Sequence, residues 1–229
     1  MKAQNSSVIK VRGFILQASY RVTTQPDGLR IPVIHLYGRL EAGGTFLVRD
    51  DRQRPHFYIR AADARRVRAL QGPEPKIVPR STFDGAPACR IDVDVPANVP
   101  PLRDRLHGAG IDTFEADVRF ASRYLIERGV KGGCQIEGEA AAGTGVTWVF
   151  DNPSLEPADV RIEPGVLSFD IETDGRAERL LAISMYAPGI DEVLIVDGSE
   201  RVMPDHATRC RDEYAALQAF CDRVRRFDP

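Results

Sequence analysis

The chain has 229 residues, of which 43% are hydrophobic and 28% are charged, close to the average for globular proteins. This composition excludes a collagen, a coiled coil and a wholly disordered chain, and the length suffices for one large domain or two small ones. The formal net charge of −2 is less basic than expected for a protein whose whole surface contacts nucleic acid, but a local basic patch stays compatible with it.

The sequence shows no sign of a membrane span or of a secretory signal. No uncharged run reaches the roughly 20 residues that a membrane helix needs, and no apolar segment follows the N-terminal Met1. The cysteines form no C-x-x-C pair and lie near no histidine in a zinc arrangement. We therefore expect unpaired thiols in a reducing compartment.

The first part of the chain predicts a β-rich domain. Apolar runs alternate with glycine and proline turn signals at hairpin spacing. The predicted strands cover residues 8–24, 31–40, 45–49 and 55–60. Residues 61–71 then predict a short helix.

The middle of the chain mixes strand, helix and loop signals. Alternating apolar and polar residues predict a half-buried strand over residues 88–95, and apolar spacing predicts helices over 100–108 and 118–128. The glycine-rich residues 129–145 predict loop and hairpin. Prolines 153, 157 and 164 predict a linker, which places a domain boundary near residue 160.

The C-terminal part has a different pattern. Three strand-like runs joined by short turns predict a β-meander over residues 165–173, 179–187 and 191–197. Apolar residues at three- and four-residue spacing predict an amphipathic helix over 212–227. The fold class is therefore α+β, with a β-rich domain at 1–160 and a second domain at 161–229.

The segment with the clearest chemistry is the first strand of that meander. Side chains alternate faces along a strand, so Asp170 and Glu172 project to one side of it. Two carboxylates on a buried apolar strand repel each other and lose hydration, and a hard divalent cation relieves both costs. Two Mg²⁺ or Mn²⁺ ions about 4 Å apart can activate a water and stabilise the leaving oxygen of a phosphodiester.

The alternative is a solvent-facing Asp-x-Glu on an edge strand, and the spacing alone favours this alternative because the pattern is common. The surrounding elements shift the balance. The pair lies at the end of the first strand of a meander that leads into a helix, which is the opening of a ribonuclease H-like sheet.

At this strand the chain resembles the family B DNA polymerases. The first exonuclease motif of their proofreading domain is similar to Phe169-Asp170-Ile171-Glu172-Thr173. A segment that precedes the exonuclease domain in this family is similar to Arg123-Tyr124-Leu125-Ile126-Glu127-Arg128. The start of the family's N-terminal domain is similar to residues 13–16, 34–38 and 55–59, and the lead-in to its second exonuclease motif to Phe227-Asp228-Pro229.

The resemblance implies a fold and an activity. It implies the N-terminal domain of a family B polymerase at 1–160, and the beginning of a ribonuclease H-like (DnaQ-like) 3′–5′ exonuclease domain at 161–229. Asp170 would bridge two Mg²⁺ (or Mn²⁺) ions, and Glu172 would bind one ion and orient the attacking water. Further ligands would follow Pro229, so we expect an N-terminal fragment that is inactive by itself. Within the family, the chain most resembles the bacterial DNA polymerase II group.

The same resemblance implies partners. The parent protein would extend DNA primers with dNTPs, bind the primer 3′ end and the single-stranded template, and contact a sliding clamp through its C-terminal part. It would work in the bacterial cytoplasm, at the nucleoid, in replication and repair. Because arginine suits phosphate contact, five arginines are candidates for DNA binding: Arg52, Arg54, Arg65, Arg66 and Arg123.

Two other functions remain open on the sequence. The first is a stand-alone 3′–5′ exonuclease, which needs the same carboxylates but no polymerase motifs. The second is a non-catalytic template-DNA-binding module in which the Asp170–Glu172 pair has no catalytic role.

Overall fold

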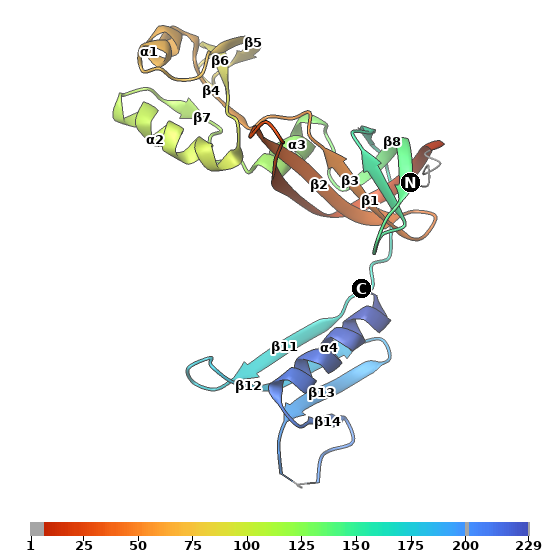
Figure 1. Ribbon diagram of the computed structural model, residues 1–229. Helices are drawn as coiled ribbons and strands as arrows, with labels where there is room; N and C mark the ends of the chain where they lie inside the picture. Colours follow the sequence, from red (N-terminus) through yellow and green to blue (C-terminus); the bar gives the residue numbers. More distant parts are fainter. Residues whose placement is uncertain (1–6, 200–201, 229) are drawn as a thin grey trace. The chain divides into compact units, whose positions relative to one another are not determined.

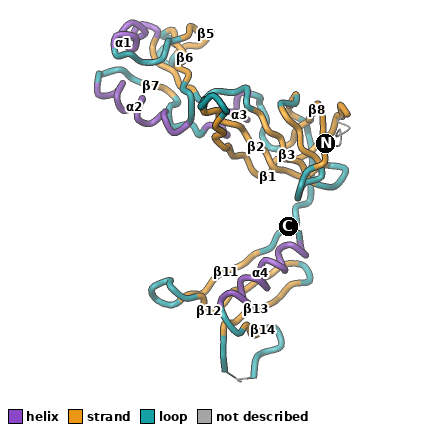
Figure 2. The backbone as a smooth tube through the Cα atoms, in the orientation of Figure 1, coloured by secondary structure: helices purple, strands orange, loops and turns teal. Residues whose placement is uncertain are grey.

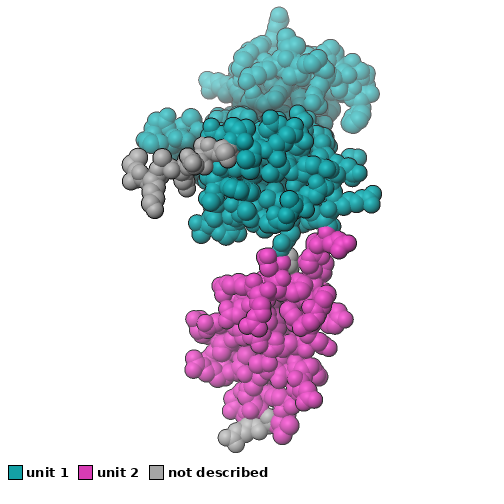
Figure 3. Space-filling model, turned by 90° about the vertical axis from the view of Figure 1, so that its right-hand side faces the viewer, with its two compact units in different colours: residues 1–162 teal, residues 163–229 magenta. Residues whose placement is uncertain are grey.

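The chain forms two compact units, Met1–Ile162 and Glu163–Pro229 (Figure 3). The computed structural model describes residues 7–199 and 202–228, so Pro229 of the Phe227-Asp228-Pro229 segment lies outside the described residues. No helix within these two ranges is long and apolar enough to cross a membrane. The structure is rich in β-strands with few helices, which confirms the expected α+β composition (Figure 2).

Unit 1 is built on a closed ring of five strands, all of which except β9 are labelled in Figure 1. They are β1 (Ser7–Thr24), β2 (Arg30–Leu40), β3 (Thr45–Asp50), β8 (Gly133–Ala142) and β9 (Trp148–Asp151), and β10 (Ser154–Pro157) adds to β8. The order is β1-β2-β3-β9-β8, and an antiparallel pairing of β8 with β1 closes the ring. The pair β3–β9 is parallel.

The ring encloses the first hydrophobic core. Ile34, Leu36, Phe46 and Val48 alternate with outward-facing residues along β2 and β3, and they are fully buried. The Phe46 ring needs glycine beside it. A Cβ atom at Gly13 would lie 2.7 Å from Phe46 Cε1, and one at Gly38 would collide with the same ring and with the Phe14 carbonyl.

A second sheet is inserted between β3 and the helix that returns to the ring. Its strand order is β5-β6-β4-β7. These strands are β4 (His56–Arg60), β5 (Lys76–Ser81), β6 (Pro87–Asp92) and β7 (Thr113–Phe114). Its helical turns are η1 (Ala61–Asp63), α1 (Ala64–Ala69), η2 (Pro96–Asn98) and α2 (Val99–Gly108).

This inserted sheet has its own core on one face. Phe57 and Ile59 of β4 pack with Cys89 and Ile91 of β6 and with residues of α1 and α2, among them Leu106. Cys89, Ile91, Val93 and Val95 are all buried, which confirms the alternation expected at 88–95. Helix α3 (Phe120–Glu127) then returns the chain to the ring core through its buried residues Phe120, Ala121 and Tyr124.

Unit 2 is a four-stranded sheet with one helix on a face. The sheet consists of β11 (Ser168–Thr173), β12 (Leu180–Ala187), β13 (Ile190–Val196) and β14 (Ala207–Cys210), and the helix is α4 (Glu213–Phe227). The first three strands form the expected antiparallel meander, and β14 pairs parallel with β13. The Asp212 carboxylate begins α4 by accepting a hydrogen bond of 2.7 Å from the Ala215 amide.

One expectation for unit 1 is right only in part. Residues 129–145 contain β8, which forms the expected hairpin with β9 but is a long strand of the closed ring rather than a loop. The glycines there mark places where another segment comes close, and not only turns. A Cβ atom at Gly133 would lie 3.0 Å from the Val160 amide nitrogen, and one at Gly138 would lie 3.0 Å from Pro153 Cβ. The linker expected after residue 151 likewise contains the short strand β10.

The ring core makes a prediction about Gly38. Gly38→Ala should lower the free energy of unfolding by about 1–3 kcal/mol, because the new methyl group collides with the Phe46 ring and the Phe14 carbonyl. Urea denaturation followed by circular dichroism measures the change. Gly108→Ala is the matched control, since nothing lies within 4 Å of that position and alanine favours the end of α2. Equal stability of the two variants would contradict the packing described here.

Candidate functional site

The predicted carboxylate pair lies on β11, at the edge of the unit 2 sheet. Asp170 is opposite Ser184 and Glu172 is opposite Ala182 on β12, and the register shifts directly after Glu172. The Phe169 ring contacts the Phe220 ring of α4, with 5.0 Å between centroids. Since side chains alternate along the strand, the two carboxylates lie on the face turned away from α4.

The expectation that this strand is buried is wrong. All six residues of β11 are exposed, including Phe169 at 54% and Ile171 at 45%. The reason is that β11 pairs only with β12 among the described strands, so one side of it has no neighbour. The carboxylates are therefore hydrated, and no desolvation cost requires a cation beside them.

The pair nevertheless has the right donors for a hard cation. Carboxylate oxygens suit Mg²⁺, which often binds proteins through only one or two carboxylates and keeps several waters. Asp170 Oδ1 accepts a hydrogen bond of 2.9 Å from the Ile171 amide, and this bond helps to orient the carboxylate. No cluster of three or more His, Cys, Asp or Glu side chains suited to a metal occurs in residues 7–199 and 202–228. In this part of the chain a metal would have these two residues as its protein ligands.

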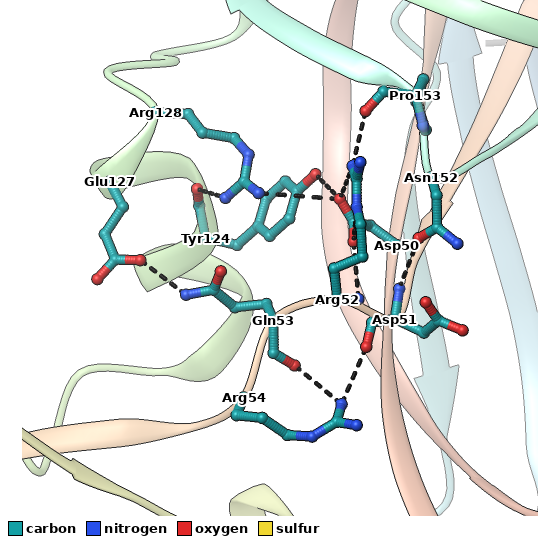
Figure 4. Close-up of polar contacts among 10 residues, drawn as sticks. All are labelled: Asp50, Asp51, Arg52, Gln53, Arg54, Tyr124, Glu127, Arg128, Asn152 and Pro153. Carbon is teal, nitrogen blue, oxygen red and sulfur yellow. Dashed lines mark hydrogen bonds and ion pairs between the residues drawn. The ribbon is translucent and has the colours of Figure 1, made fainter. Parts of the chain in front are cut away.

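Two of the five candidate arginines are occupied by contacts near the end of β3 (Figure 4). Arg52 donates to both oxygens of Asp50, at 3.0 Å from Nε and 2.6 Å from Nη2, and its Nη2 also donates to the Pro153 carbonyl. Arg54 donates from Nη1 to the Asp51 carbonyl at 2.9 Å. Both side chains stabilise the turn that leaves the ring.

The other three differ in exposure. Arg123 is only 4% exposed and pairs with the Glu115 carboxylate at 2.7 Å. Arg66 pairs with Asp63 and donates to the Ala109 carbonyl. Arg65 is exposed on α1 and has no hydrogen bond or ion pair with any residue of the described ranges. The structure therefore does not gather the five arginines into one patch of free guanidinium groups.

The sequence did not single out Asp50, which is the centre of a buried polar cluster in unit 1. Its side chain is fully buried at the inner end of β3. It accepts hydrogen bonds from Arg52 and from the Tyr124 hydroxyl at 2.7 Å, and Arg128 Nη2 lies 3.8 Å away. The Arg128 guanidinium also lies 3.6 Å from the centroid of the Tyr124 ring. A signal for this cluster exists, because Phe46, Val48 and Asp50 share the inward face of one strand.

Burial and hydrogen bonding act in opposite directions on Asp50. Burial raises the pKa of the carboxyl, but the hydrogen bonds from Arg52 and Tyr124 outweigh burial and hold the pKa below its usual value. Burial, followed by the bond to Asp50, raises the pKa of Tyr124. The phenol is therefore a stable hydrogen-bond donor at neutral pH.

Glu127 connects α3 to the segment between β3 and β4 and to the first residue of β4. Its carboxylate accepts from Gln53 Nε2 at 2.7 Å and lies 2.8 Å from His56 Nε2. His56 is buried, and its Nδ1 lies 3.0 Å from the Arg54 carbonyl. Arg123, Tyr124, Glu127 and Arg128 thus all make internal contacts, so the polar residues of the 123–128 segment hold the inserted sheet and the ring together.

Asp50→Asn should lower the free energy of unfolding at neutral pH by about 3 kcal/mol, because a buried ion pair loses one partner. The folded-state pKa of Asp50 is depressed, so its contribution is present above the unfolded value of about 3.9 and lost as pH falls through the folded value. The difference from the unmutated chain should therefore shrink below about pH 4. Urea denaturation across this pH range measures it.

Asp104→Asn serves as the control for Asp50→Asn. Asp104 pairs with Arg103 at 2.8 Å, but its side chain is 64% exposed, so the expected change is within about 1 kcal/mol at every pH. A constant difference between Asp50→Asn and the unmutated chain down to pH 2 would contradict the role assigned to the Asp50 carboxylate.

Comparison with known proteins shows that the chain is similar in sequence to part of several DNA polymerases. No protein-family model matches the chain. A DNA polymerase of Archaeoglobus fulgidus is 25% identical over 232 residues, which cover 96% of this chain and 28% of that protein. A DNA polymerase of Pyrococcus glycovorans is 30% identical over 115 residues, 43% of this chain and 15% of that protein. The chain thus spans less than a third of the length of these relatives.

The structural comparison agrees with the sequence comparison. The solved structure of the family B DNA polymerase from the hyperthermophilic archaeon Pyrobaculum calidifontis matches with a TM-score of 0.68 and 25% identity. The match covers 95% of this chain and 29% of that one. In both sequence and fold, the chain is similar to part of a family B DNA polymerase from archaea.

Proposed function

We propose that this chain is part of a DNA-directed DNA polymerase of family B that also carries a 3′–5′ proofreading exonuclease. The extent of the similarity carries the proposal. The alignments to DNA polymerases cover 96% of the chain in sequence and 95% in structure, so both units take part. The whole protein would extend primers by nucleotidyl transfer from dNTPs. Its DNA partners would be the primer 3′ end and the single-stranded template.

The exonuclease part of the proposal rests on unit 2. The antiparallel meander β11-β12-β13 with α4 on one face supports a ribonuclease H-like domain. Asp170 and Glu172 lie together on the open face of its first strand, where a DNA 3′ end has access. Two bound Mg²⁺ or Mn²⁺ ions would supply an activated water and charge stabilisation at the leaving oxygen. Asp170 would hold both ions, and Glu172 would hold one and orient the water.

We also propose that residues 1–229 alone lack useful exonuclease activity. The described residues supply two carboxylates and no third acidic or histidine ligand close to them. Two-metal hydrolysis needs a site that fixes both ions and the scissile phosphate between them. Exposed side chains on an edge strand hold their position less firmly than side chains in a packed core.

Three finer parts of the proposal concern the whole protein. We place it in the bacterial cytoplasm at the nucleoid, acting in replication and repair, with a sliding clamp as a further partner. A close relationship to bacterial DNA polymerase II stays a prediction, because the relatives named above are archaeal.

A specific observation supports a second function, a template-DNA-binding module. The five-stranded ring of unit 1 has the connectivity of an OB-fold barrel, including the parallel pair β3–β9 and a helix between β3 and β8. Barrels of this type bind single-stranded nucleic acid in many proteins. This function is compatible with a polymerase, and it is the one that remains if Asp170 and Glu172 prove inactive.

The test uses the complete product of the gene. Asp170→Ala and Glu172→Ala should each lower Mg²⁺-dependent degradation of a mismatched primer 3′ end by roughly a hundredfold or more, because a metal ligand is lost. Primer extension with dNTPs should stay unchanged. Gel-resolved time courses with an end-labelled primer measure both reactions.

Asp191→Ala is the control, since Asp191 is an exposed carboxylate on β13 of the same sheet. It should leave both reactions unchanged. Degradation that survives in both β11 variants would contradict the exonuclease assignment. Degradation without any primer extension would contradict the polymerase and point to a stand-alone exonuclease.

A further inference from the structure

The inserted sheet of unit 1 has a pocket on the face that does not carry α1 and α2. Phe57 and Ile59 of β4 face the helices, and Tyr58 between them faces the pocket. The cavity has a volume of about 460 Å³, in the range of small-ligand sites. Its lining includes Tyr58, Arg80, Thr82, Phe83, Phe114 and Glu115, which come from β4, the β5–β6 hairpin and the segment around β7.

Arginine side chains lie over two of the aromatic rings that line the pocket, those of Tyr58 and Phe114. Arg80 lies 5.5 Å and Arg123 5.7 Å from the centroid of the Tyr58 ring. Arg60 lies 5.4 Å from the centroid of the Phe114 ring. A guanidinium held on an aromatic face keeps its in-plane N–H donors directed outward, where they can reach an anion.

The charges of the pocket do not balance. Arg123 pairs with Glu115 at 2.7 Å, and Arg60 pairs with Asp84 at 2.6 Å. Arg80 is exposed and makes no hydrogen bond or ion pair with the residues that the structure describes. The two carboxylates are therefore neutralised, and one positive charge remains at the pocket.

A hydrophobic ring stands beside this charge. Phe83 is fully exposed in the turn of the β5–β6 hairpin, and it lines the same pocket as Arg80. Because its ring is fully exposed, Phe83 contributes little packing energy to the fold. Next to an uncompensated arginine, it selects a ligand that has both a planar apolar face and a negative charge.

A nucleotide has both properties, and we infer that this pocket holds one unpaired nucleotide of a single-stranded nucleic acid. Phe83 stacks on the base and Arg80 binds the phosphate. The choice of nucleic acid rests on the proposed function, since a polymerase must handle an unpaired template strand. Free nucleotides share the same chemistry, so the experiment separates the two sources.

The test measures binding of the full chain to a fluorescein-labelled oligothymidine of about 16 nucleotides by fluorescence anisotropy at several salt concentrations. Arg80→Gln and Phe83→Ala should each weaken binding roughly fivefold to thirtyfold, the loss expected for one stacked base or one phosphate contact. Arg80→Gln should also flatten the dependence of log affinity on log salt by about 0.7, since one phosphate contact is lost. Both side chains are exposed, so thermal unfolding should not change.

Arg105→Gln is the matched control. It removes one exposed arginine from α2, on the other face of the inserted sheet, and should leave affinity within about twofold. Equal loss in Arg105→Gln and Arg80→Gln would overturn the pocket in favour of diffuse charge attraction. So would unchanged affinity in both pocket variants, or no binding of the oligonucleotide.

Competition with free dTMP separates the two sources of the ligand. The oligonucleotide should bind at least tenfold more tightly than dTMP, and equal affinity would overturn the strand as ligand. The result does not decide the proposed function. Primer extension by the complete gene product is measured separately, and either result can fail while the other stands.

Discussion

The fold of unit 1 depends on keeping one buried carboxylate satisfied. Asp50 ends β3 on the inward face of the ring, where an unpaired charge would cost several kcal/mol. Its partners come from three separate places: Arg52 directly after the strand, and Tyr124 and Arg128 on and after α3. Arg52 in turn binds the Pro153 carbonyl before β10. One acidic side chain therefore fixes the relative positions of β3, α3 and the turn after β9.

The sequence predicts helices and strands well where the spacing of apolar residues along the chain determines them. The first four strands, the meander of unit 2 and helix α4 all follow from alternation or helical spacing. The sequence predicts a hairpin at 129–145 but not the length of β8, because the glycines suggest turns, whereas they make room for the Val160 backbone and for Pro153. Nothing local reveals such a close approach, because the approaching atoms come from another part of the chain. Ring closure through β1 and β8 is missed for the same reason.

For the candidate site, the sequence predicts which face of the strand the two carboxylates share, but it does not predict how exposed they are. The common face of Asp170 and Glu172 follows from strand geometry, whereas exposure depends on which strands pair, and β11 has one neighbour. The arginines show the same limit. Composition gives their number, but whether a guanidinium is free depends on carboxylates and carbonyls that fold next to it. Arg123 is buried against Glu115, and Arg80, which drew no attention in the sequence, keeps its charge free at a pocket.

The placement of the inserted sheet affects how the ring can form. Residues that meet at the β1–β8 seam, such as Gly13 and Cys134, are 121 positions apart in the chain. Closing so long a loop from an open chain is entropically costly and slow. The insert has its own hydrophobic core, and the contacts of Glu127 with Gln53 and His56 hold its entry and exit together. If the insert folds first, it shortens the effective loop between β1 and β8. The inserted domain can therefore speed the closure of the ring, although it separates the ring strands in the sequence.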